Sequence, residues 1–275
     1  MRIILNNRAL LKISGRDAEA FLQNQFSNDI KKIDSNKVQF NAYCQHQGKV
    51  IAFFWVMRMG KDFLLSFPVE LLEKIENRLK IFVIMSDVII ENVTNILSQT
   101  GLINESSPNE FRVNDELAIE IDDSIGQVEE LAENQIRWKK ACLDSHLPEI
   151  YNVTSEKLVP QMLNLDINEL GVSFSKGCYP GQEVVARLHY LGSAKRRLFS
   201  FKTNHEVQVG DSLYCATSKT ALARGDRYKG SGIVVSKVKY NSLFYCLATL
   251  DVDLMDDDIT INNEHGPKLE RINDE

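Results

Sequence analysis

Two apolar runs in the first quarter of the chain, residues 38–44 and 49–57, are separated by only the four residues from Gln45 to Gly48. A connection this short can join only neighbouring antiparallel strands, so the two runs predict a β-hairpin. Residues 62–67 predict a third strand. Pro68 then opens a stretch with helical spacing of its apolar residues, Leu71, Leu72, Ile75, Leu79 and Phe82. Hairpin-joined strands mixed with amphipathic helices predict an α+β fold.

Other segments before residue 195 extend this pattern. Asp17 is a suitable N-cap for a helix whose apolar face begins at Ala18 and continues at Phe21 and Leu22. The patterns further along predict strands at 88–97 and 117–121, a loop at 102–114, a helix at 129–143 and irregular chain at 154–168.

The pattern changes after Lys195. Short apolar runs separated by glycine, asparagine and aspartate occur at residues 198–201, 212–214, 232–238 and 244–250. They predict a small β-barrel, and hence two parts of the chain, residues 1–194 and 195–275. The aspartates between residues 251 and 258 lack the glycine and glutamate of a calcium-binding loop, so they predict a solvated acidic edge.

Composition limits the class of protein. Among 275 residues, 44% are hydrophobic and 25% are charged, which is enough for a core without a metal or disulfide. A net charge of −6 argues against direct nucleic-acid binding. Five scattered cysteines without zinc-ligand spacing predict free thiols and no metal site. The chain start resembles no targeting peptide and no apolar run is long enough to span a membrane, so we expect a cytoplasmic protein without a membrane part.

The stretch SFSKGCYPGQEVVARLHYLG, residues 173–192, carries the most distinctive chemistry. Pro180 is favoured in the first turn of a helix, which predicts a helix starting near Tyr179 or Pro180. Cys178 would then lie at the N-terminal end, where unpaired N–H groups and the nearby Lys176 lower a thiol pKa from about 8.5. The pattern predicts a reactive cysteine.

From spacing alone, a buried cysteine that only packs is an equally good interpretation of Cys178. One thiol cannot hold an iron–sulfur cluster, which normally needs four ligands. A nucleophilic enzyme would need a histidine base, and His46, His146 and His189 could approach Cys178 only through folding.

Residues 176–183, KGCYPGQE, resemble the K-G-C-Y-x-G-Q-E signature of the YgfZ family, folate-binding proteins similar to the aminomethyltransferase (T-protein) of the glycine cleavage system. Residues 160–166, PQMLNLD, resemble the P-Q-x-x-N-L segment of that family. Cys44 with Gly48, Lys49 and Val50 resembles its C-x-x-x-G-[RK]-V turn, and residues 14–29 resemble its opening helix. The likeness covers most of the chain.

This resemblance implies a T-protein-like arrangement of three domains around a central hollow, with two intertwined subdomains in residues 1–194 and a C-terminal β-barrel. It implies that tetrahydrofolate or a one-carbon derivative binds in the hollow. The implied role is support of iron–sulfur cluster synthesis or repair in client proteins, such as tRNA-modifying radical-SAM enzymes. The alternatives are a one-carbon (aminomethyl) transferase that uses tetrahydrofolate, and a non-catalytic folate- or tRNA-binding module.

The resemblance also implies site residues. Cys178 would be the reactive group and Lys176 would tune it. The expected folate contacts are Tyr179, Gln182, Glu183, Arg187, Gln161, Asn164, Asn28 and Asp29. Simpler roles remain open for several of them: Tyr179 could only pack, and Arg187 could pair with Glu183 one helical turn away.

Two segments depart from the family pattern. Where the family has R-I-x-x-G-I-P, this chain has residues 142–148, with Cys142 at the arginine position and His146 at the glycine position. Residues 92–102 do not match the catalytic aspartate segment of true aminomethyltransferases. We therefore do not predict glycine-cleavage activity.

Overall fold

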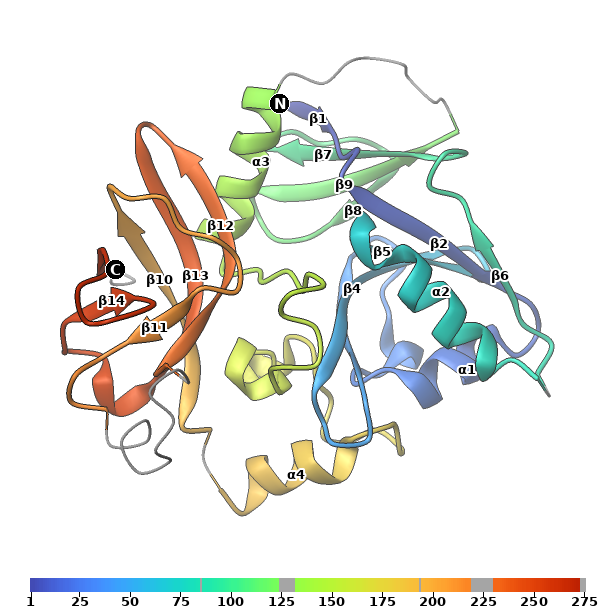
Figure 1. The fold of residues 1–275 in the computed structure, drawn as a ribbon. Helices are drawn as coiled ribbons and strands as arrows, with labels where there is room; N and C mark the ends of the chain where they lie inside the picture. Colours follow the sequence, from blue (N-terminus) through green and yellow to red (C-terminus); the bar gives the residue numbers. More distant parts are fainter. Residues whose placement is uncertain (85, 124–131, 193, 219–229, 273–275) are drawn as a thin grey trace.

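The computed structural model describes residues 1–84, 86–123, 132–192, 194–218 and 230–272 (Figure 1). Its strands form a five-stranded sheet in the order β3-β4-β5-β2-β6, a four-stranded sheet in the order β1-β7-β9-β8, and a closed barrel in the order β10-β13-β12-β11-β14-β15. The predicted α+β fold with a C-terminal β-barrel is confirmed.

The five-stranded sheet contains the predicted hairpin. It is built from β2 (Arg8–Ser14), β3 (Gln39–Cys44), β4 (Val50–Met59), β5 (Asp62–Pro68) and β6 (Ile89–Asn92), all antiparallel. Every side chain of β4 from Val50 to Met57 is buried, so both faces of this strand are covered. That double coverage explains why the run is apolar throughout rather than alternating.

Helices α1 (Ala18–Gln25) and α2 (Leu72–Ile81) form where the periodicity predicts them. Two details of the predictions are wrong. Phe82 caps α2 and is 41% exposed, so it does not belong to the buried face. The predicted strand 88–97 ends at Asn92, because a turn follows in which the amides of Ile96 and Leu97 both donate to Val93 O.

The four-stranded sheet consists of β1 (Arg2–Ile4), β7 (Ser98–Ile103), β8 (Glu110–Arg112) and β9 (Leu117–Asp122). The prediction of an uninterrupted loop over residues 102–114 is therefore wrong. These strands are short, and β7 pairs on one side with the N-terminal strand β1, far away in sequence. The predicted helix appears as α3 (Ala132–Asp144), while the predicted residues 129–131 lie outside the described residues.

The barrel contains the four predicted strands as β10 (Arg196–Thr203), β11 (Ser212–Tyr214), β12 (Gly232–Tyr240) and β13 (Leu243–Asp251). Two further strands, β14 (Ile259–Ile261) and β15 (Lys268–Ile272), were not predicted, because acidic and polar residues flank their short apolar pattern. Pairing of β15 with β10 closes the barrel around a core separate from that of the sheets. The division at residues 194 and 195 stays a prediction.

The segment between α3 and the barrel is irregular, as predicted, apart from 3-10 turns at Pro160–Leu163 and Ile167–Glu169, and it leads into α4 (Gln182–Tyr190). In Figure 1 it lies between the N-terminal sheet and the barrel. None of the helices in the described ranges is both long and apolar enough to span a bilayer.

Candidate functional site

Cys178 lies on an exposed loop that precedes α4. The helix begins at Gln182, with Gly181 as its N-cap, so the predicted start at Tyr179 or Pro180 is two to three residues too early. The thiol therefore lies ahead of the helix and not at its N-terminal end, which removes the geometric reason for expecting the dipole to act on it. All five cysteines are free thiols, and Cys178 is the exposed one.

The loop is held in place by a close contact between two glycines. Gly181 has φ +84° and Gly48, in the β3–β4 turn, has φ +74°. A Cβ added to Gly181 would lie 2.4 Å from Gln45 O and 2.7 Å from Gly48 Cα. A Cβ on Gly48 would lie 2.9 Å from Val184 Cβ. Only glycine allows the hairpin turn and the start of α4 to approach this closely.

Lys176 anchors the other side of the loop. Its side chain is buried, and Nζ donates to the carbonyl oxygens of Gln23 (2.6 Å), Phe26 (2.5 Å) and Asn28 (2.9 Å), in the last turn of α1 and just beyond it. A cation is favoured at that end of a helix. Burial lowers the pKa of Lys176 to about 8, and the charge of Asp29 opposes this shift. All three contacts position the loop on α1.

The two residues predicted near α1 take part in the same anchoring. Asn28 donates from Nδ2 to Phe40 O (3.0 Å), and its backbone amide donates to Asn41 Oδ1 (3.0 Å). Asp29 accepts from Gln23 Nε2 (2.9 Å). These contacts fix the chain that supplies a carbonyl oxygen to Lys176.

Gln161 and Asn164 connect the irregular segment to its neighbours. Gln161 is buried and donates from Nε2 to Val185 O in α4 (2.7 Å). Asn164, at φ +59°, donates to Leu198 O (2.9 Å) and accepts from Leu198 N (3.3 Å) in β10. Both side chains thus join α4 and the barrel to the segment between them.

The remaining predicted residues lie on or beside α4. Tyr179 is buried, and this burial raises its pKa, so the packing interpretation describes it better than an open stacking face. Glu183 and Arg187 are exposed and Gln182 is half-buried. The expected ion pair between Glu183 and Arg187 is not formed among the described residues.

Histidines do not partner the thiol. The ring of His189 stacks on Phe174 with centroids 3.7 Å apart, and His146 Nε2 lies 2.9 Å from Ser200 Oγ. Within the ranges that the structure describes, no hydrogen bond joins a histidine to Cys178, and no group of three or more histidine, cysteine, aspartate or glutamate side chains is placed to hold a metal ion.

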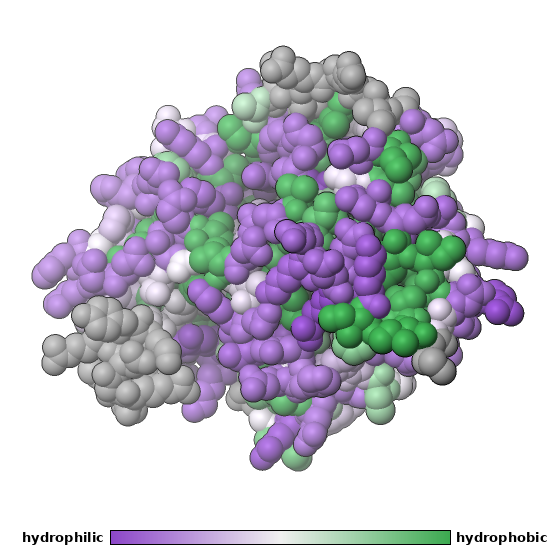
Figure 2. All heavy atoms as spheres, turned by 45° about the vertical axis from the view of Figure 1, so that its right-hand side comes forward, coloured by the Kyte–Doolittle hydropathy of each residue, from purple (hydrophilic) through white to green (hydrophobic). Residues whose placement is uncertain are grey.

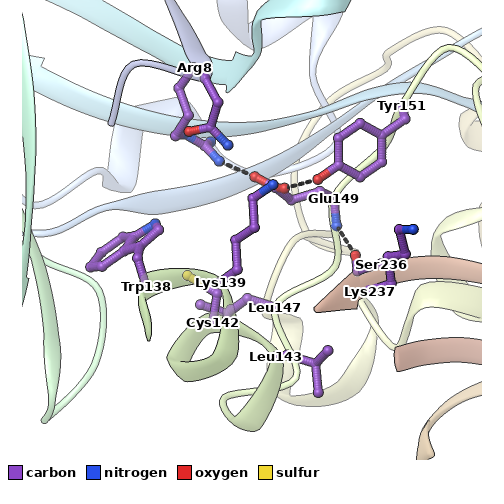
Figure 3. Close-up of a pocket in the computed structure, with 11 residues that line it drawn as sticks. Arg8, Trp138, Lys139, Cys142, Leu143, Leu147, Glu149, Tyr151, Ser236 and Lys237 are labelled. Carbon is purple, nitrogen blue, oxygen red and sulfur yellow. Dashed lines mark hydrogen bonds and ion pairs between the residues drawn. The ribbon is translucent and has the colours of Figure 1, made fainter. Parts of the chain in front are cut away.

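A cavity opens where the five-stranded sheet, α3 and the barrel meet (Figure 3). Its free volume is about 20 Å³, roughly the space of one water molecule. The lining residues come from all three units and are Asn7, Arg8, Trp138, Lys139, Cys142, Leu143, Leu147, Glu149, Tyr151, Ser236 and Lys237. The ten predicted site residues do not line this cavity, whereas part of the divergent segment 142–148 does.

An ionic network crosses the cavity. The Arg8 guanidinium is buried and donates to Ser66 Oγ (2.8 Å), to Ser66 O (3.1 Å) and to Glu149. The Tyr151 hydroxyl donates to the other oxygen of Glu149, and the backbone amide of Glu149 donates to Ser236 Oγ (3.1 Å) in β12. Burial and the Glu149 charge raise the pKa of Tyr151 well above its ordinary value. Glu149 thus joins the sheet to the barrel.

The sequence analysis did not identify this network. Its only local signal is Arg8, a cation at the start of an otherwise mostly apolar strand. In the structure, Arg8 is only 2% exposed. Arg8 and Glu149 lie 141 residues apart in the chain, so no spacing pattern relates them.

Comparison with known proteins places the chain in a family. No family model matches it. A protein of Colwellia psychrerythraea called tRNA-modifying protein YgfZ is 30% identical over 236 residues, which cover 74% of this chain and 72% of that protein. The chain belongs to the YgfZ family. A YgfZ protein of Blochmanniella pennsylvanica is 26% identical over 85% of this chain and 81% of its own length, and an uncharacterized protein of Haemophilus influenzae is 27% identical over 92% and 89%.

The fold of this YgfZ-family chain is that of a T-protein. The crystal structure of the glycine cleavage system aminomethyltransferase T from Bartonella henselae superposes with a TM-score of 0.69 over 99% of this chain and 84% of that protein. Sequence identity is 12%, so this similarity concerns the fold alone. The predicted T-protein-like architecture is confirmed.

Proposed function

We propose that this protein binds tetrahydrofolate or a one-carbon derivative in the cytoplasm and supports iron–sulfur cluster synthesis or repair in clients such as tRNA-modifying radical-SAM enzymes. The observation that carries the proposal is Cys178, an exposed thiol in the signature loop of a chain whose YgfZ relatives are called tRNA-modifying proteins. Cys178 is its reactive group.

Lys176 and the other anchoring residues support this role by holding the loop. Lys176 fixes the loop on α1, Gly181 fixes it on the β3–β4 turn, and Gln161 fixes the following helix. Cys178 is thereby presented on a loop with little freedom to collapse inward. We infer that most of the residues first expected to contact folate act instead by positioning the thiol.

The cavity between the sheet, α3 and the barrel is the best candidate for the folate site. Asn7 Oδ1 lies at its wall, is buried, and has no hydrogen-bond partner among the described residues. A pterin ring offers N–H donors for such an acceptor and for the Glu149 carboxylate. Lys139 and Lys237, which also line the cavity, can attract the carboxylates of the folate tail.

Folate binding at this place requires the cavity to open. Pockets for ligands of this size hold several hundred Å³, whereas the free volume here is about 20 Å³. The Trp138 and Lys139 side chains of α3 line the cavity and would have to move. The ring centroids of Trp138 and Trp55, the two tryptophans of the chain, lie 6.2 Å apart. Tryptophan fluorescence therefore reports directly on this opening.

A fluorescence titration with tetrahydrofolate tests the binding half of the proposal. We expect saturable quenching, and a roughly tenfold weaker affinity for Asn7→Ala because one hydrogen bond is lost. Gly177→Ala is the matched control, since a Cβ there meets no atom within 4 Å. Absence of saturable binding would remove folate from the proposal.

The thiol is tested separately in cells. Cys178→Ser should abolish support of iron–sulfur enzymes while the purified variant keeps its folate affinity and its unfolding free energy. Gly177→Ala should complement fully. Full complementation by Cys178→Ser would show that the thiol is not the reactive group.

The T-protein fold favours one alternative, a one-carbon transferase. An assay of methylene transfer separates the two functions. It contains the purified protein, an amine donor of the methylene group, and tetrahydrofolate as the acceptor. Turnover in this assay would support the transferase, whereas the accessory role predicts none.

A further inference from the structure

Three cationic side chains surround the carboxylate of Glu156 beside α2. Lys74 Nζ lies 2.7 Å from Glu156 Oε1 and donates to Ser155 Oγ (2.9 Å). The hydrogen bond from Lys74 lowers the pKa of Glu156, and the charges of Lys74, Arg78 and Lys49 lower it further, while burial opposes the shift. We call Lys49, Lys74, Arg78 and Glu156 the α2 cluster. Its three cations and one carboxylate leave a net charge of +2.

The α2 cluster is open to solvent. Helix α2 lies on the right in Figure 1, and Figure 2, in which that side comes forward, shows a mostly hydrophilic area across the middle of the molecule. The side chains of Lys74 and Glu156 are 39% and 40% exposed, so a dissolved molecule can reach them. The cavity in Figure 3 is lined by other residues, so the α2 cluster is separate from the proposed folate site.

Two polar groups on the inner side of the cluster are buried and unpaired. Tyr43 is 1% exposed, and neither its hydroxyl nor Arg78 Nε has a hydrogen-bond partner among the described residues. Arg78 Cζ lies 5.7 Å from the centroid of the Tyr43 ring. Burial raises the pKa of Tyr43 and the Arg78 charge opposes this shift, which places the guanidinium near the hydroxyl. Buried polar groups normally have a partner, so these two groups indicate a missing one.

The missing partner is an acceptor with negative charge. Arg78 Nε–H can only donate, and the Tyr43 hydroxyl has a hydrogen to donate. In the described ranges neither Lys49 nor Arg78 forms an ion pair, so the excess positive charge is not balanced by the chain. A phosphate monoester carries a charge of about −1.5 to −2 at pH 7, which matches the cluster, whereas one carboxylate would balance only half of it. Guanidinium groups also bind phosphate oxygens in a favourable paired geometry.

The other carboxylates of this helix do not balance the cluster. Glu76 pairs with Lys80 at 2.6 Å, and Glu70 accepts from a backbone amide. Glu73 is exposed and lies five positions before Arg78, which is about 140° around the helix axis. These three side chains therefore leave the positive charge of the cluster available to a ligand.

We propose that the α2 cluster and the Tyr43 hydroxyl form a binding site for a phosphate group, either inorganic phosphate or the phosphate monoester of a small molecule. The phosphate oxygens accept from Tyr43 OH, Arg78 Nε and Lys74 Nζ, and Lys49 adds positive charge. Arg78 is half-buried, and its flexible side chain must shift to admit an oxygen between Nε and the hydroxyl. The site does not depend on folate binding or on Cys178.

Isothermal titration calorimetry of the full chain with inorganic phosphate, at constant ionic strength, tests the proposal. We expect saturable binding with a Kd on the order of 1 mM, and none with acetate. Tyr43→Phe should weaken binding about fivefold because one hydrogen bond is lost, and Arg78→Met more than tenfold. Glu156→Gln should strengthen binding, because it removes the carboxylate that competes for Lys74. Lys80→Met is the matched control on the same helix and should leave the Kd unchanged.

A parallel titration with glycerol 3-phosphate distinguishes the two sources, since tighter binding of the ester indicates a phosphorylated small molecule. Three results would overturn the proposal: no saturable binding of phosphate up to about 20 mM, equally tight binding of acetate, or a Kd that Tyr43→Phe and Arg78→Met leave unchanged. Circular dichroism checks the fold of each variant. If Arg78→Met does not fold, Glu156→Gln decides, because a purely structural cluster predicts no gain in phosphate affinity.

Discussion

Replacing Gly181 by alanine tests the contact that fixes the signature loop. An alanine at φ +84° costs about 1–2 kcal/mol in backbone conformation. Its Cβ would also lie 2.4 Å from Gln45 O and 2.7 Å from Gly48 Cα, both backbone atoms that cannot rotate away. Separating the hairpin turn from α4 costs a further 1–3 kcal/mol, typically about 2, as in other overpacked sites.

Replacing glycine by alanine also lowers the conformational entropy of the unfolded chain, which raises the free energy of unfolding by about 0.4–1 kcal/mol. Gly181→Ala should therefore lower the free energy of unfolding by about 2–4 kcal/mol. Gly177, four residues earlier in the same signature, is the control. A Cβ on Gly177 meets nothing within 4 Å, so Gly177→Ala should leave stability unchanged or raise it by about 0.5 kcal/mol.

Equilibrium urea unfolding of the two variants and the wild type measures this difference. Because a Cβ on Gly181 would contact Gly48, Gly48→Ala combined with Gly181→Ala should give a non-additive change. The alkylation rate of Cys178 should change in Gly181→Ala, since the loop must shift. Equal stability of Gly181→Ala and Gly177→Ala, within about 0.5 kcal/mol, would refute the reasoning.

Three further predictions concern the anchors and the ionic network. Lys176→Met should lower stability at pH 7 by about 2 kcal/mol, because three backbone carbonyls lose their donor. Burial lowers the pKa of Lys176 from 10.5 to about 8. Between these two pH values the unfolded chain binds more protons than the folded one, so the folded state gains stability as the pH rises. Urea unfolding should therefore show the wild type gaining stability relative to Lys176→Met from pH 8 to pH 10.5. Glu149→Gln should lower the pKa of Tyr151, which burial and the Glu149 charge raise, in an ultraviolet titration of the phenol. Asn164→Ala should cost about 2–3 kcal/mol in urea unfolding and Asn164→Gly about 1 less, because both lose the bonds to Leu198 but only alanine is strained at φ +59°.

Local sequence pattern was sufficient to predict the elements that form from neighbouring residues. The β3–β4 hairpin, α1, α2 and four barrel strands could be predicted, since their side-chain periods and turns are contained in one short stretch. β1 and β7 could not, because each is stabilised by the other across about 100 residues, with Arg2 opposite Leu102. Barrel closure by β15 depends in the same way on distant pairing with β10.

In the candidate site, too, the sequence identified residues of a contiguous motif but not the contacts they make with distant segments. Lys176 and Cys178 could be identified because the signature is one contiguous stretch. Their surroundings could not: the start of α4 is displaced to Gln182 because Gly181 is held in a left-handed conformation against the hairpin turn. Glu149 meets Arg8 only after three units of the fold assemble.

By itself the sequence determined the α+β class, the C-terminal barrel, the family resemblance and the position of the distinctive thiol, because helix and strand periods and contiguous motifs are local properties. Only the tertiary structure decided that Cys178 is exposed ahead of the helix, that Lys176 binds three carbonyls at and just beyond the end of α1, and that the cavity is lined by other residues. The physical reason is that burial, charge pairing and close backbone contact depend on which distant segments pack together, and chain spacing does not encode that packing in any local pattern.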